Sequence, residues 1–147
     1  MPNPSLKALD SCKDPRQAAF IIIFHSFYKQ YFCQDLLHHW KSKNTPSPKD
    51  MSFCQRISMG VLQRWKTLEK VATLHSSKDK LSLKGKEKVL LYLGLYQKLF
   101  LDRVPMYSII DEGNKLNYQY ASKFFSKFFT ACVQKAEAKD IEPPKTF

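Results

Sequence analysis

A chain of 147 residues, 44% hydrophobic and 14% aromatic, is long enough to bury one core and corresponds to about one domain. Its 4 glycines argue against a glycine-rich nucleotide-binding loop, and 24 basic against 13 acidic residues give a net charge of +11. This charge indicates an anionic partner, nucleic acid ahead of a membrane surface, but is equally compatible with a basic surface of no specific use. Lysine supplies 20 of the basic residues, which favours phosphate contacts over base readout.

The cysteines and histidines give no sign of a metal site. The four cysteines lie far apart in the chain, at Cys12, Cys33, Cys54 and Cys132, and no histidine stands at ligand spacing from them. We therefore expect reduced thiols and a cytoplasmic protein. The adjacent His38 and His39 should point in different directions from one helix and face solvent. No apolar run has the length of a membrane span, and none resembles a signal peptide.

The N-terminal residues 1–14 contain two prolines and little periodicity, so we expect a loose arm. Asp14 followed by Pro15 is the pattern of an N-cap and a first-turn proline, which predicts a helix over residues 15–31 with Phe27 and Tyr31 inside. Apolar spacing predicts the later elements, which are helices over 34–41, over 51–75 as one helix or two with a bend, and over 120–138, and loops over 42–50 and 76–88.

The stretch 89–112 organises the rest of the chain. Its apolar residues recur every three to four positions, as in a core helix, at Val89, Leu93, Tyr96, Leu99 and Phe100. Ser82 is a suitable N-cap for this helix. Pro105 disfavours helical geometry at the preceding residue and is tolerated in the first turn of a new helix. Two helices should therefore meet at a tight corner, and periodicity alone assigns them to core packing.

The exact residues of this stretch are more informative than its apolar spacing. The run LGLYQKLFLDRVP at 93–105 resembles the central helix pair of the NusB-like RNA-binding fold, and Glu112 after it matches too. A second patch, GVLQRWKTLEKV from Gly60, is similar to another segment of that fold. The closest resemblance is to the N-terminal domain of Sun-family methyltransferases, which act on cytosine C5 of 16S ribosomal RNA.

The resemblance implies an all-α bundle of about six or seven helices without a sheet, spanning residues 15–138. It also implies an RNA-binding module that positions ribosomal RNA for methylation. The chain itself has no Pro-Cys motif and no glycine-containing turn for S-adenosylmethionine, so that cofactor and the catalysis would belong to a domain following residue 147, with 139–147 as the linker. Two alternatives stay open. One is a free-standing NusB factor of transcription antitermination, which binds a leader RNA and a small ribosomal protein. The other is a helical protein-interaction module whose basic face meets an acidic protein.

The residues expected to bind RNA are basic residues on the polar sides of these helices. In the family, basic residues near the start of the first helix contact RNA. In this chain, a lysine-rich run at 76–88 precedes the central helix. The candidates are Lys13, Arg16, Arg56, Arg64, Lys66, Lys84, Lys86 and Lys88. A solvated surface is the competing interpretation for each. Trp65 lies in register with core residues and is expected to be a core anchor. Arg103 and Glu112 are expected to form a structural pair at the corner.

Overall fold

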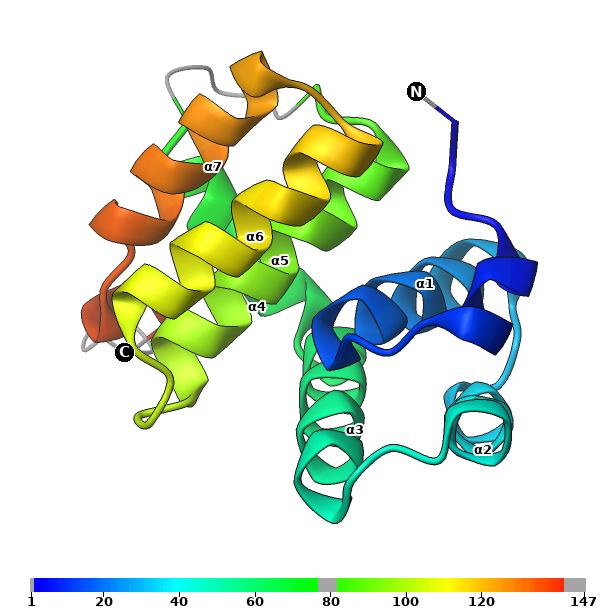
Figure 1. The fold of residues 1–147 in the computed structure, drawn as a ribbon. Helices are drawn as coiled ribbons and strands as arrows, with labels where there is room; N and C mark the ends of the chain where they lie inside the picture. The colour runs from blue at the N-terminus through cyan, green and yellow to red at the C-terminus, as the bar shows by residue number, and fades with distance from the viewer. Residues whose placement is uncertain (1, 77–81, 142–147) are drawn as a thin grey trace.

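The computed structural model describes residues 2–76 and 82–141, and every described element is helical. The elements are η1 (Leu6–Ser11), α1 (Pro15–Lys29), α2 (Cys33–Asn44), α3 (Pro48–Gln63), α4 (Trp65–Leu74), α5 (Gly85–Phe100), α6 (Met106–Tyr120), α7 (Lys123–Lys135) and η2 (Ala138–Ile141), where η denotes a 3₁₀ helix. Figure 1 shows η1 and α1 to α3 on one side of the molecule and α5 to α7 on the other. With no strand in the described residues, the predicted all-helical fold is confirmed.

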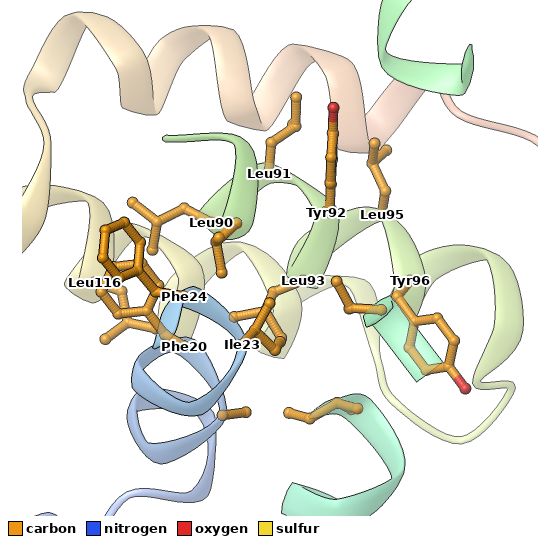
Figure 2. Close-up of a cluster of buried hydrophobic side chains, with 14 of the residues drawn as sticks. Phe20, Ile23, Phe24, Leu90, Leu91, Tyr92, Leu93, Leu95, Tyr96 and Leu116 are labelled. Atoms are coloured by element: carbon orange, nitrogen blue, oxygen red, sulfur yellow. The ribbon is translucent and has the colours of Figure 1, made fainter. Parts of the chain in front are cut away.

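Two helices, α1 and α5, are buried on all sides in their central turns. Residues 18–25 of α1 and 89–97 of α5 are continuously buried, and α5 contacts α1, α3, α4, α6 and α7. In Figure 2, Ile23 of α1 lies next to Leu93 of α5, whereas Leu91 and Tyr92 of α5 point to the opposite side. Sequence periodicity predicted an apolar stripe for these helices, and the tertiary structure makes them the centre of the core.

The long apolar segment after the second helix is broken into α3 and α4 at Arg64, whose φ and ψ are −112° and 23°. The α3 helix begins earlier than predicted, because the Ser47 hydroxyl accepts from the Asp50 amide at 3.1 Å and a proline opens the first turn. Trp65 opens α4 and is 8% exposed. Its ring meets the Tyr92 ring edge-on with centroids 4.8 Å apart, which confirms the predicted core anchor.

The predicted corner lies between α5 and α6, where residues 101–105 leave helical geometry before Pro105 caps the next helix. The start of α5 differs from the prediction. It begins at Gly85, and Ser82 is not its cap, because the Glu87 carboxylate accepts from the Lys84 backbone N–H at 2.9 Å. Residues 77–81 of the lysine-rich loop lie outside the described residues.

The N-terminal segment is not the loose arm that the sequence suggested. Leu9 in η1 is fully buried, and the indole N–H of Trp40 donates to the carbonyl of Cys12 at 2.7 Å. The side-chain amide of Asn44 donates to the carbonyl of Leu9 at 2.9 Å. These bonds from α2 satisfy buried backbone acceptors, and so they fix a segment that has little periodicity of its own.

The ends of the last two helices also differ from the prediction. Tyr120 closes α6, and α7 begins after Ser122, whose hydroxyl accepts from the Phe125 amide at 3.1 Å. The expected linker 139–147 starts inside η2. His75, the C-cap of α4, forms a hydrogen bond of 2.7 Å with the Asp140 carboxylate of η2. Residues 142–147 lie outside the described residues. In α1, Phe27 is partly exposed, and Tyr31 lies beyond the end of the helix and is exposed.

Candidate nucleic-acid interface

A groove of about 790 Å³ lies at the C-terminal end of α5, where the corner to α6 meets α1 and α3. Its cationic lining residues are Arg16, Lys49, Arg56 and Arg103. Two carboxylates, those of Asp50 and Asp102, and apolar residues such as Phe53 and Phe100 complete the lining. The groove therefore combines an excess of positive charge with aromatic and aliphatic walls.

Three helices present their N-terminal ends to this groove. Pro15 belongs to the first turn of α1, Lys49 to that of α3, and Pro105 is the N-cap of α6. The amino end of a helix carries a partial positive charge and unpaired N–H groups, which favour anions. The C-terminal end of α5 contributes the opposite sign. Three positive ends against one negative end leave a field that suits an anionic ligand.

Local sequence explains how two of these helix starts are fixed. The Asp14 carboxylate accepts from the backbone N–H groups of Arg16 and Gln17 at 3.2 and 3.4 Å, and Pro15 occupies the first turn. At α3, Ser47 is the cap and a proline again follows. In both helices the cap and its proline are followed by a basic residue of the groove, so this pattern places Arg16 and Lys49 in a first helical turn.

Arg16 lies in the groove wall, but part of its hydrogen-bonding capacity is used within the protein. Its Nε–H donates to Oε1 of Gln97 at 2.9 Å, and Nη2 donates to the Ser108 hydroxyl at 3.3 Å. Its guanidinium also lies 4.9 Å from the centre of the Phe53 ring. Burial lowers the pKa of this guanidinium, against the opposing charges of Asp14 and Glu112, but arginine stays protonated in proteins. Arg16 therefore ties α1 to α5 and α6 as well as adding charge.

Arg56 and Arg64 are exposed and lie close to the groove. Arg56 lines both the groove and an adjoining hollow of about 390 Å³ on α3, which Tyr96 also borders. The guanidinium of Arg64 lies 4.3 Å from the centre of the Phe100 ring, itself a groove residue. Phe100 in turn stacks on Tyr96 with centroids 5.2 Å apart. The structure thus brings three of the sequence-predicted residues to one end of α5: Arg16 of α1, Arg56 of α3, and Arg64 at the junction of α3 and α4.

The other predicted residues do not join this cluster. Lys84, Lys86 and Lys88 lie at the opposite end of α5, whose 16 residues span about 24 Å. Lys84 is exposed and Lys88 half-buried, but Lys86 is 4% exposed, and burial lowers the pKa of its ammonium group. A patch running from Lys84 to Lys88 is therefore not presented to solvent as one surface. Lys13 is exposed just before α1 and donates to the carbonyl of Asn44 at 3.5 Å, and Lys66 is exposed on α4.

Sequence reasoning missed two groove cations. Lys49 was placed in a loop, although the Ser-Pro pair before it is a helix start that would have put it in a first turn. Arg103 was expected to pair with Glu112. In the described residues Glu112 instead pairs with Lys115 at 3.1 Å, and Arg103 is exposed in the groove lining. The predicted structural pair is wrong because the corner directs Arg103 toward the groove.

The described residues contain no group of three or more metal-ligating side chains, and no described helix is long and apolar enough to cross a bilayer. The cysteines are free thiols, and burial raises the pKa of each, to about 12 for Cys54 and to about 11 for Cys12, Cys33 and Cys132. His38 and His39 are both exposed, as predicted, and His39 bonds to Asp10.

Comparison with known proteins agrees with the fold. The model of the NusB family matches residues 13–138, which is most of the chain and includes all seven α-helices. A search of curated proteins finds no match. Because the family match covers well over half of the sequence, the chain belongs to the NusB family, a family of RNA-binding domains.

Proposed function

We propose that this domain holds RNA in the groove at the C-terminal end of α5, with Lys49, Arg56 and Arg103 neutralising backbone phosphates. The convergence of three helix N-termini with these exposed cations carries the proposal. Arg16 supports the wall from behind through Gln97 and Ser108. Contacts of this kind fix the position of a phosphate chain, and the affinity should fall steeply as salt rises.

We further propose that the RNA is ribosomal and that the domain is the RNA-binding module of a Sun-type cytosine-C5 methyltransferase. The run that carries this resemblance, 93–105, ends in the residues that line the groove, Asp102 to Pro105. The methyltransferase domain and its S-adenosylmethionine would then act in cis on RNA that this domain positions. A free-standing NusB factor with a small ribosomal protein as partner uses the same fold and remains the alternative.

Fluorescence anisotropy with a labelled ribosomal RNA fragment, titrated at several salt concentrations, tests the groove. Arg56→Ala and Arg103→Ala should each weaken binding and reduce the slope of log affinity against log salt by about one. Lys127→Ala, which removes an exposed lysine of α7 away from the groove, is the matched control and should change neither quantity. Unchanged affinity and slope in both groove variants would reject the proposed interface.

A genetic measurement separates the two finer functions. In cells lacking the gene, 5-methylcytosine is mapped across the ribosomal RNA. Loss of one methylated position supports the methyltransferase module. An intact methylation pattern together with reduced transcription through ribosomal operons supports the free-standing factor. Reading the gene beyond codon 147 gives an independent check, since a methyltransferase requires a Rossmann-like continuation.

A further inference from the structure

A cluster of exposed aromatic side chains lies at the C-terminal end of α1, away from the groove lining. Phe27, Tyr28, Tyr31 and Phe32 are all exposed within six consecutive residues. Single exposed aromatic residues are ordinary, but a contiguous group marks an interaction surface. Phe27 and Tyr28 are in direct contact, with ring centroids 4.9 Å apart.

The Phe27 ring has one face covered and one face free. It stacks on the Trp65 ring with centroids 3.7 Å apart and planes 19° from parallel. Trp65 is itself held by Tyr92 of α5 and is nearly buried. Because Trp65 covers one face of Phe27, the 41% of this residue that is exposed lies mainly on the opposite face and edges. Phe27, Tyr28 and Trp65 thus form an aromatic platform, in which the Phe27 ring lies nearly parallel to Trp65 and presents its outer face, and the Tyr28 ring stands edge-on to both at 66° and 82°.

Cations flank this platform. The Tyr28 ring lies across the first turn of α5, where a Cβ on Gly85 would be 2.8 Å from its Cζ. Lys84, directly before that glycine, and Lys29, directly after Tyr28, are both exposed. The nearby carboxylates are those of Glu69, which together with the larger effect of burial raises the pKa of Tyr28, and of Glu87, which accepts from the Lys84 backbone N–H. Two exposed lysine ammonium groups beside a flat aromatic face suit a ligand that joins phosphates to a planar apolar part.

The platform is also connected to the groove. Arg64 precedes Trp65 in the chain, and its guanidinium lies over Phe100 of the groove. An RNA strand leaving the groove near Phe100 would pass Arg64 and reach the other side of α4. The exposed Arg64 guanidinium would keep the strand in a favourable field between the two surfaces.

We propose that the aromatic platform is a second RNA subsite, where an unpaired base stacks on the outer face of Phe27 while Lys84 and Lys29 contact the adjoining phosphates. The inference rests on the proposed RNA binding in the groove and extends it. A parallel pair of rings presents a π face that any base can continue, irrespective of its hydrogen-bonding edge. The subsite therefore recognises single-stranded RNA without base specificity.

Two probes separate stacking from charge: a short single-stranded oligoadenylate, and an abasic chain of the same length with the same sugar-phosphate backbone. Phe27→Leu should weaken oligoadenylate binding by about tenfold, within the range for loss of one base–aromatic stack. Its affinity for the abasic chain should stay at the wild-type value. Phe27→Tyr keeps the ring and should keep wild-type affinity for both probes, and both variants are first matched to the wild type by thermal unfolding.

Phe124→Leu is the matched control, because it makes the same change at an 85% exposed phenylalanine on α7. It should leave the affinity for both probes unchanged. Equal affinity of Phe27→Leu and wild type for oligoadenylate would overturn the platform, as would a loss in Phe27→Tyr equal to that in Phe27→Leu. The groove is judged separately by Arg56→Ala, which should weaken both probes alike. If neither Arg56→Ala nor Arg103→Ala has an effect, or the abasic chain does not bind, it is the groove proposal that fails.

Discussion

Phe129 of α7 provides a sharp test of how the core is assembled. The tip of its ring lies between two glycines, Gly94 of α5 and Gly113 of α6. A Cβ built on Gly113 would lie 2.5 Å from the ring Cζ, and one on Gly94 would lie 2.6 Å from Cε2. Moving the ring away from one helix brings it toward the other, so the ring cannot relieve a clash by a small shift. These glycines allow α5, α6 and α7 to meet around one aromatic ring.

The variant Gly113→Ala sets two effects against each other. Alanine favours the helix over glycine by about 1 kcal/mol. Overpacking a filled core costs about 1–3 kcal/mol, and clearances well below 3 Å place this case at the upper end. We therefore expect Gly113→Ala to lower the free energy of unfolding by about 2 kcal/mol, despite its better helix propensity.

Urea denaturation followed by circular dichroism measures this difference. Gln119→Ala, at an exposed position of the same helix, is the control and should stay within about 0.5 kcal/mol of the wild type. Introducing Gly113→Ala into a Phe129→Leu background should cost much less than in the wild type, because the aromatic tip is gone. A Gly113→Ala protein as stable as the wild type would refute the argument from the Phe129 contact.

Three further outcomes are expected. Arg16→Lys removes the donor to Oε1 of buried Gln97 and should lower the unfolding free energy by about 1–3 kcal/mol, measured by the same denaturation; equal stability would show that the bond contributes nothing. Burial alone would raise the pKa of Asp140, but hydrogen bonds from His75 and the Glu137 amide outweigh it and lower that pKa. The stability that this carboxylate contributes is therefore present above its unfolded pKa of about 4 and is lost as pH falls through the lowered folded value. Amide hydrogen exchange in η2 should accelerate over that acidic range in the wild type but not in His75→Ala, and parallel profiles would contradict this. The buried thiols of Cys12, Cys54 and Cys132, whose pKa values burial raises, should react slowly with iodoacetamide near about pH 8 until the protein is unfolded. Rapid labelling of these three thiols in the native protein would count against their buried packing.

Local patterns predicted the helices well, because the caps and prolines that start and end a helix lie within a few residues of it. Asp14 and Pro15 start α1 as expected, and Pro105 separates α5 from α6. The N-terminal segment was predicted wrongly because its order comes from Trp40 and Asn44 of α2, which lie about thirty residues away. Hydrogen bonds of that kind leave no periodic signal in the segment that they fix.

The candidate site was predicted only in part, for the same reason. Charge and resemblance pointed to Arg16, Arg56 and Arg64, and these do lie at one end of α5. Neither feature distinguishes a lysine that the fold buries, such as Lys86, from one that it exposes. Net charge is a sum over the chain, whereas a binding surface depends on which helix ends meet.

The sequence by itself determined that the chain is helical and that it has one core. It also determined where α1 begins and where α5 breaks, because capping residues, prolines and apolar spacing act over a few residues. Only the tertiary structure decided which helix ends converge. The groove requires the starts of α1, α3 and α6 to meet the end of α5, and the platform requires Phe27 of α1 to lie on Trp65 of α4. Both depend on packing between residues far apart in the chain, which is set by the complementary shapes of whole helices.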